Sequence, residues 1–270
     1  MRRMEKNYFH DIAGHFLALK AEQIPEAAMA SMRRGLLNYV GGSLYAASHD
    51  CCRPLISFFE KMHPGQGLSS IWGEPGRYIP AAAGFCNAAR LSTLELNDGT
   101  GASAHPGIYV WSAVFAGMET YGADTGTVLR AVLFGYETAT RMAKLSVNRI
   151  LELGLHNPGF VGGLGAASAM GLLRGLTPEQ LDNAFGMTAS LSPLCPFVSF
   201  VEGTDTKDFY GGWGTYLGII AADAAASGLT GPKSVLNGVK SLESVFQGRD
   251  GAEIPLGDPY MITQDRKSVV

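Results

Sequence analysis

Five side chains suited to proton transfer lie in turn-forming segments of this sequence, each beside a helical run. Glu95 and Asp98 belong to a short acidic stretch, and His105 follows it directly before a Pro-Gly pair. His156 lies in a second turn, LHNPG, and Lys207 lies in a third, GTDTK. Carboxylates, imidazoles and an ammonium group can move protons on a small anionic substrate, and loops commonly carry such groups. The sequence therefore indicates an enzyme.

Each of these groups also has a purely structural interpretation. His105 and His156 could be ordinary histidines at the entry to a helix, because each precedes a run of small residues. Lys207 could form a salt bridge with Asp205 or Asp208, or it could be partly buried by the aromatic and glycine-rich stretch that follows it. A partly buried lysine either pairs with a carboxylate or acts as a base. The residue types alone leave these alternatives open.

The composition of the chain argues against two classes of binding partner. The chain has 270 residues, of which 46% are hydrophobic, so it can bury a large core. It carries 24 acidic and 21 basic residues, a net charge of −3, without a run of like charge. Nucleic acid and anionic membranes are polyanions that basic surfaces bind. We therefore expect no nucleic-acid partner and no membrane partner.

Metal, disulfide and nucleotide sites lack their usual patterns. The four cysteines have no CxxC spacing and no paired Cys/His cluster, so we expect no metal site, and reduced thiols in a cytoplasmic protein. The most apolar run, 160–173, is too short for a bilayer and holds four glycines. Its GGLG sequence lacks the preceding strand that a dinucleotide site needs. We expect no cofactor, and a buried helix here.

Helical periodicity dominates the chain, and alternating strand patterns are nearly absent. The clearest helix start is Thr177, a good N-cap, followed by Pro178 at the first helical position and Gln180 at the capping-box position. Helices are predicted at 24–47, 80–96, 108–118, 126–145, 160–173, 178–191 and 211–227. We predict an all-α domain over residues 1–250 whose Gly/Ala-rich helices pack closely. The helix ends should bring the five candidate side chains to one cleft.

Several motifs in one order resemble the MmgE/PrpD family, which includes 2-methylcitrate dehydratase, cis-aconitate decarboxylase and iminodisuccinate epimerase. The resemblance covers about 24–248. It is carried by AAAGFCN at 81–87, LELND at 94–98, HP at 105–106, HNPGFVG at 156–162 and TK at 206–207, followed by a glycine-rich helix. The order and spacing of these motifs make the resemblance far more specific than any single motif.

The resemblance implies a metal-independent lyase, a dehydratase or decarboxylase, or an isomerase, that abstracts a proton next to a carboxylate of a small polycarboxylate. It also implies a homodimer with a large all-α domain and a smaller α/β lid domain. Its acidic motif falls on Glu95 and Asp98, its HP motif on His105, its second histidine on His156 and its lysine on Lys207. These five are the expected catalytic residues.

Two departures from the family pattern leave the substrate open. Where the family resembles Asp-Phe-Asp-Asp-Thr, this chain has ELNDG at 95–99, and Ser92 replaces a histidine commonly found shortly before that motif. Residues 251–270 are expected to be a tail where the lid domain would begin, with the lid largely missing. Three alternatives follow: a lidless binding or scaffold subunit, a separate chain that supplies the lid, or an atypical enzyme for a larger substrate.

Overall fold

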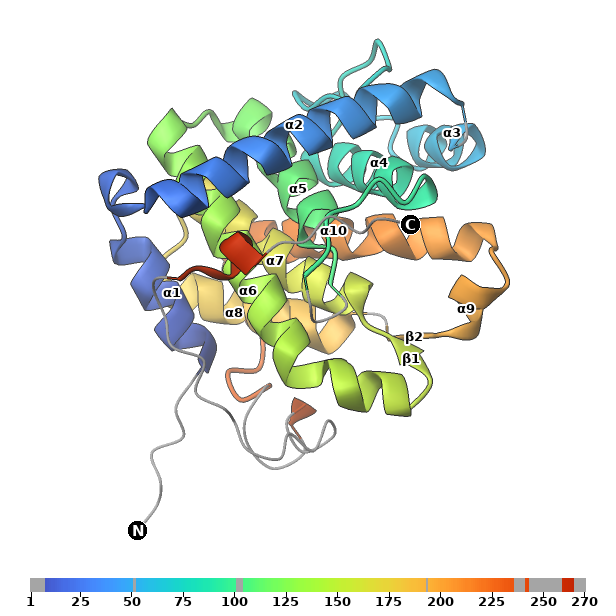
Figure 1. The fold of residues 1–270 in the computed structure, drawn as a ribbon. Helices are drawn as coiled ribbons and strands as arrows, with labels where there is room; N and C mark the ends of the chain where they lie inside the picture. Colours follow the sequence, from blue (N-terminus) through green and yellow to red (C-terminus); the bar gives the residue numbers. More distant parts are fainter. Residues whose placement is uncertain are drawn as a thin grey trace.

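Helices account for nearly all regular structure in the computed structural model, which describes residues 8–50, 52–100, 104–192, 194–235, 241–242 and 259–264. The α-helices are α1 Tyr8–Ala18, α2 Glu26–Ser48, α3 Arg53–Met62, α4 Pro80–Thr93, α5 Pro106–Tyr121, α6 Thr125–Glu152, α7 Pro158–Leu173, α8 Pro178–Leu191, α9 Val198–Val201 and α10 Asp205–Ala226. Two 3₁₀ turns, η1 Ala21–Gln23 and η2 Met261–Gln264, complete the helical elements (Figure 1). The prediction of an all-α fold is confirmed.

The central element is α7, whose residues are buried along its whole length and which packs against α5, α6, α8 and α10 (Figure 1). Its glycines permit backbone-to-backbone contact. A Cβ atom on Gly218 of α10 would lie 2.5 Å from the Gly163 carbonyl oxygen, and one on Gly165 would lie 2.8 Å from the Gly135 carbonyl oxygen. The predicted buried helix and the close packing of small-residue helices are both confirmed.

Local capping signals explain where several helices begin. At α8 the Thr177 hydroxyl accepts from the Gln180 amide at 3.3 Å, and the Gln180 side chain accepts from the Thr177 amide at 3.0 Å. This is the predicted capping box. At α6 the Asp124 carboxylate accepts from the Thr127 amide at 3.0 Å. These bonds satisfy amides that have no partner inside their helix.

The main correction to the predicted helices concerns α10, which begins at Asp205 and not at 211. Asp205 and Asp208 lie in its first turn, where carboxylates stabilise the positive end of the helix dipole. Lys207 therefore lies on the first turn of a helix, in a fixed orientation, and not in the turn before it. α6 also continues to Glu152, beyond the predicted end at 145.

A single pair of two-residue strands fixes the approach to α7. β1, Leu155–His156, pairs antiparallel with β2, Cys195–Pro196, so that His156 lies opposite Cys195. Within the described ranges this is the only sheet. The pairing ties the start of α7 to the segment that leads to α9 and α10, and these three helix ends surround the candidate site.

Part of the predicted tail packs on the helices. Of residues 251–270, the structure describes 259–264, while 251–258 and 265–270 lie outside the described residues. η2 contacts α2 and α6, and the Met261 amide donates to the buried Glu137 carboxylate. No described helix has both the length and the apolar content needed to cross a bilayer.

Candidate active site

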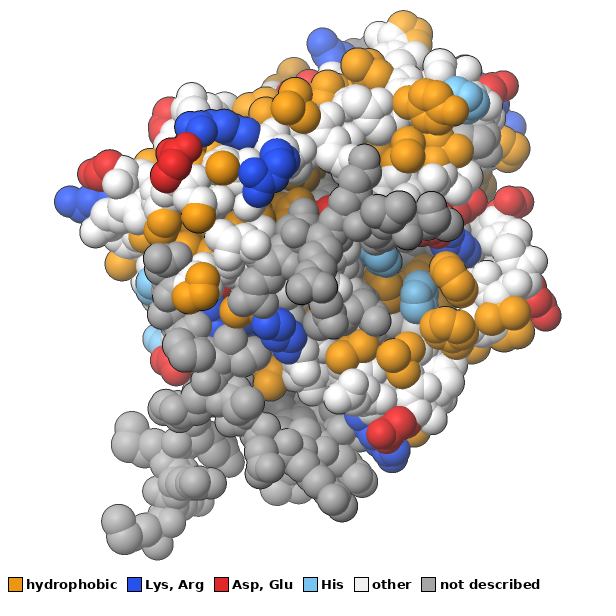
Figure 2. Space-filling model, viewed as in Figure 1, with side chains coloured by type: hydrophobic (Ala, Val, Ile, Leu, Met, Phe, Trp, Pro, Cys, Tyr) orange, Lys and Arg blue, Asp and Glu red, His pale blue; other side chains and the backbone are white. Residues whose placement is uncertain are grey.

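The ends of α4, α5, α7, α9 and α10 border an open cavity of about 310 Å³. Histidine side chains lie on this face of the molecule beside hydrophobic side chains, just above the β1–β2 pair in the view of Figure 2. The cavity is lined by Ser92, Glu95, Asn97, His105, Ile108, Tyr109, His156, Pro158, Phe200, Lys207 and Tyr210. Four of the five predicted site residues are therefore brought together, from segments far apart in sequence.

His105 is held as the residue that precedes α5. Its Nδ1 lies 2.7 Å from the backbone carbonyl oxygen of Asp98. A carbonyl oxygen only accepts, so Nδ1 must carry the proton, and in the neutral imidazole Nε2 then keeps its lone pair. The ring lines the cavity. His105 is thus arranged to take a proton through Nε2.

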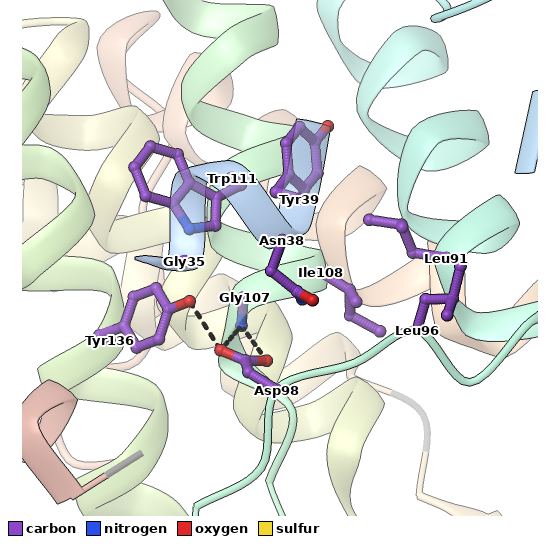
Figure 3. A pocket seen from close by; sticks show the side chains of 10 residues that line it. All are labelled: Gly35, Asn38, Tyr39, Leu91, Leu96, Asp98, Gly107, Ile108, Trp111 and Tyr136. Atoms are coloured by element: carbon purple, nitrogen blue, oxygen red, sulfur yellow. Dashed lines mark hydrogen bonds between the residues drawn. The ribbon is translucent and has the colours of Figure 1, made fainter. Parts of the chain in front are cut away.

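Asp98 is the predicted site residue whose carboxylate does not line this cavity. It is buried and accepts from the Gly107 amide at 2.9 and 3.0 Å and from the Tyr136 hydroxyl at 2.6 Å (Figure 3). A Cβ atom on Gly107 would lie 2.5 Å from the Asp98 carboxylate, so the contact requires glycine. Burial raises the pKa of Asp98, while Tyr136, His105 and the Gly107 amide oppose the shift.

The geometry gives Asp98 an indirect role at the cavity. Its carboxylate caps the first turn of α5, while its own carbonyl oxygen orients the His105 ring. It lines a second, smaller pocket of about 210 Å³ with Asn38 and Trp111, on the other side of the α5 terminus (Figure 3). Asp98 therefore acts on the cavity through His105.

Glu95 and Lys207 form an ion pair across the cavity wall. Burial lowers the pKa of Lys207, and the Asp208 carboxylate opposes that shift. The Glu95 carboxylate pairs with the ammonium and favours its charged form, as Asp208 does. The Phe200 ring lies 5.2 Å from the ammonium nitrogen and adds a cation–π contact. The predicted partners of Lys207, Asp205 and Asp208, are replaced by Glu95 as its direct contact.

The backbone at Glu95 is unusual. Its φ angle is +52°, in the left-handed region that favours glycine, directly after the last turn of α4. A residue with a side chain costs about 1–2 kcal/mol in this conformation. Strain of this kind often accompanies a functional position. Here it turns the carboxylate toward Lys207.

His156 is enclosed by aromatic side chains. Its ring centroid lies 5.4 Å from those of Phe197, Phe200 and Tyr210, and its Nδ1 lies 2.9 Å from the Tyr210 hydroxyl. Burial lowers the pKa of His156 to about 4, and the nearby His105 adds to the shift. The imidazole of His156 is therefore neutral at neutral pH, which a prediction from sequence could not establish.

Tyr210 and Phe200 are site residues that the sequence analysis did not identify. Tyr210 lies in the aromatic and glycine-rich stretch after Lys207, which from sequence indicates only partial burial of that lysine. Tyr210 is three positions from Lys207, so both side chains lie on one face of α10, while Phe200 belongs to α9. This helical spacing was the available signal, and it depended on placing the start of α10 at Asp205.

Metal-binding clusters are absent from the described ranges: no group of three or more His, Cys, Asp or Glu side chains is arranged to hold an ion. The three described cysteines, Cys52, Cys86 and Cys195, form no disulfide. Cys51 lies outside the described residues. The described side chains that line the cavity are therefore acid–base, ammonium and aromatic groups.

The fold and the site define a helical domain of the MmgE/PrpD N-terminal type, and the model of that domain matches residues 10–254. The chain belongs to the MmgE/PrpD family. It is similar to cis-aconitate decarboxylase of Homo sapiens, 25% identical over 87% of this chain and 49% of the relative. It is also similar to cis-aconitate decarboxylase of Aspergillus terreus, 29% identical over 63% of this chain and 36% of the relative.

A third relative is the cis-aconitate decarboxylase-like protein oryM of Aspergillus oryzae, 25% identical over 69% of this chain and 40% of the relative. The matched region thus spans no more than about half the length of these curated relatives. The family assignment rests on the domain model, which matches most of the chain.

Proposed function

We propose that the protein is a metal-independent lyase or isomerase that abstracts a proton next to a carboxylate of a small polycarboxylate. The observation that carries the proposal is the cavity itself, in which two imidazoles and an ammonium group from three separate helix ends face one space. Proton transfer needs a positioned base, and the resulting enolate needs a positive or hydrogen-bonding partner. The family relatives, named as cis-aconitate decarboxylases, support a lyase of this class.

Each group has a role in this proposal. Lys207 binds a substrate carboxylate, which takes the place of Glu95 beside the ammonium. His105 receives the substrate proton at Nε2, because its Nδ1 is already engaged by the Asp98 carbonyl. His156, neutral and buried, lies where it can stabilise the developing negative charge or protonate the product. Dehydration, decarboxylation and isomerisation all begin from such an intermediate and differ in the group that leaves.

The direct test is turnover of cis-aconitate, citrate and 2-methylcitrate by the wild type and by three single variants, His105→Gln, His156→Gln and Lys207→Met. Positioned acid–base groups contribute roughly 10²–10⁴-fold to rate, so each variant should lose at least a hundredfold. The matched control is His49→Gln, because His49 is exposed, its ring bonds to Ser48 and to the Tyr45 carbonyl, and it does not line the cavity. Wild-type activity in all three site variants would contradict the proposal.

A binding or scaffold role is the second candidate, because the chain matches about half the length of its relatives. An open, hydrated cavity weakens electrostatic catalysis, so this domain could bind a polycarboxylate without converting it. Thermal shift against the same three acids, followed by the turnover assay on any binder, separates the two functions. A co-purifying α/β protein would instead identify a separate lid-supplying chain, and turnover of larger acids alone would identify an atypical enzyme.

We also propose a homodimer formed through α2. Leu37, Leu44 and Tyr45 are more than half exposed on this helix, at spacings that place them along one side. Hydrophobic side chains follow the upper edge of the molecule in Figure 2, where α2 runs in Figure 1. Contiguous exposed apolar surface commonly marks an interface. Light scattering at micromolar concentration should give a dimer for the wild type and a monomer for Leu37→Asp/Leu44→Asp; a monomeric wild type contradicts the proposal.

A further inference from the structure

The Tyr210 hydroxyl is a junction between three groups behind the cavity. The Gly159 amide donates to its oxygen at 3.1 Å, the Nδ1 atom of His156 lies 2.9 Å away, and the Cys195 thiol lies near it. The side chain is buried. Every bond of this hydroxyl is therefore to protein, and the direction of each bond can be worked out.

A hydroxyl has one hydrogen to donate and two lone pairs to accept with. The Gly159 amide occupies one lone pair, because an N–H can only donate. The hydrogen then goes either to His156 or to Cys195. A neutral imidazole nitrogen is a good acceptor, whereas a thiol sulfur is a weak one. The hydrogen therefore goes to His156, and the remaining lone pair accepts the S–H of Cys195.

Three protonation states support this direction. Burial lowers the pKa of His156 to about 4, so its ring is neutral and one nitrogen can accept. Burial raises the pKa of Cys195, while the nearby Tyr210 hydroxyl opposes the shift, so the sulfur keeps its proton. Burial also raises the pKa of Tyr210 well above its usual range, so its hydroxyl keeps its proton as well. If His156 donated to Tyr210 instead, the Tyr210 hydrogen would have to be directed at the Cys195 sulfur, which is a weak acceptor.

We infer that Tyr210 is a positioning residue whose hydroxyl donates to Nδ1 of His156 and thereby holds the imidazole as the Nε2–H tautomer. His156 then presents a hydrogen-bond donor to the cavity, whereas His105, held through Nδ1–H, presents an acceptor. The two histidines are fixed in opposite tautomers and are not interchangeable. The different catalytic roles of the two histidines rest on the proposed function, but the assignment of their tautomers does not.

The surrounding backbone keeps Tyr210 in place. A Cβ atom on Gly159 would lie 2.4 Å from the Tyr210 ring, so glycine at the start of α7 is what lets the ring lie there. The antiparallel pairing of β1 and β2 places Cys195 opposite His156. His156 and Cys195 therefore approach the hydroxyl from one small sheet, and the second turn of α10 supplies the ring.

The test is a long-range ¹H–¹⁵N NMR spectrum of the full chain labelled with ¹⁵N-histidine at neutral pH. Comparison with His156→Gln and His105→Gln identifies the two ring systems. The wild type should show an Nε2–H tautomer for His156 and an Nδ1–H tautomer for His105. An Nδ1–H tautomer at His156 overturns the inference, and this outcome does not depend on any activity.

The variant Tyr210→Phe removes only the hydroxyl. It should mix the tautomers of His156 and, where the wild type turns over a substrate, lower kcat roughly tenfold to a hundredfold with little change in KM, as loss of an orienting partner does. The control is Tyr216→Phe, also on α10, whose hydroxyl lies near His63 at 3.4 Å. A pure Nε2–H tautomer in Tyr210→Phe overturns the inference, while absence of turnover in the wild type counts against the proposed function alone.

Discussion

Two carboxylate–cation pairs in this protein have opposite surroundings. Glu137 and Arg141 are one turn apart on α6 and both fully buried; the Arg141 Nε atom donates to the Glu137 carboxylate at 2.9 Å, and Nη2 lies 2.8 Å from the same oxygen. Glu95 and Lys207 come from distant parts of the chain, and their side chains are 37% and 17% exposed. The first pair holds the core and the η2 segment together, since the Met261 amide also donates to Glu137. The second pair borders the cavity.

The comparison shows that burial of a charge pair is not what marks the candidate site. The buried pair has ordinary helical backbone, and its geometry cannot change without opening the core. The cavity pair has left-handed backbone at Glu95 and an ammonium that a substrate carboxylate can reach. A pair that can exchange partners suits binding, whereas a pair that cannot suits stability.

Breaking the buried pair should give the largest effect. Glu137→Leu leaves the Arg141 guanidinium in the core without this carboxylate, and should cost on the order of 3 kcal/mol of unfolding free energy. Arg141→Leu should cost less, because burial already raises the pKa of Glu137 to about 7 and the carboxyl can take up a proton. Urea unfolding measures both. Equal losses would show that the guanidinium is not the costly partner.

Breaking the cavity pair should affect turnover more than stability. Lys207→Met should lower kcat/KM roughly 10²–10³-fold, the usual cost of losing a group that stabilises developing charge. Its unfolding free energy should change by less than about 1 kcal/mol, since the pair is partly exposed. Lys207→Arg keeps the positive charge but spreads it over a planar guanidinium group, so it should recover turnover only in part. A stability loss as large as that of Glu137→Leu would remove the distinction between the two pairs.

The neutral state of His156 predicts a pH dependence of stability. Its pKa is about 4 in the folded protein and about 6.5 in the unfolded chain, so the unfolded state binds more protons between these values. Stability from this group is complete above about pH 6.5 and is lost as pH falls toward 4. With allowance for partial exposure, the loss should be about 1–2 kcal/mol. Urea unfolding of His156→Gln should lack this component; an unchanged pH profile would assign it to other groups.

The smallest effect concerns the backbone at Glu95. Glu95→Gly removes the left-handed strain as well as the carboxylate, whereas Glu95→Gln removes the charge and keeps the strain. The glycine variant should be more stable than the glutamine variant by about 0.5–1 kcal/mol, the strain relieved minus the flexibility that glycine adds to the unfolded chain. Thermal unfolding of the two variants in parallel measures it. A less stable glycine variant would show that the φ angle is not costly here.

Local signals made much of the fold predictable from sequence. α8 begins and ends at the predicted residues 178 and 191, because its capping box specifies the start without tertiary help. The start of α10 was harder to predict from sequence, because Gly211 and Gly212 weaken a helix in isolation. In the structure they allow close approach to α4, where a Cβ atom on Gly212 would lie 2.7 Å from the Phe85 carbonyl oxygen. Packing between helices outweighed local propensity.

The candidate site was also predictable from sequence only in part. That Glu95, His105, His156 and Lys207 line one cavity was predictable, because each lies at or near a helix end. The direction of the Asp98 carboxylate was not, since it depends on Tyr136 from another helix. The tautomers of the histidines depend on hydrogen bonds over long sequence distances, which no local pattern specifies. Sequence therefore located the side chains but not their protonation.

The central position of α7 has a consequence for the order of folding during synthesis. α7 ends at Leu173, yet one of its main packing partners, α10, ends only at Ala226. Until about fifty further residues have left the ribosome, the side of α7 that packs against α10 has no partner, and contacts of such long range form slowly. The nascent chain therefore passes through a stage with exposed apolar surface, the stage at which chaperones bind and at which aggregation begins.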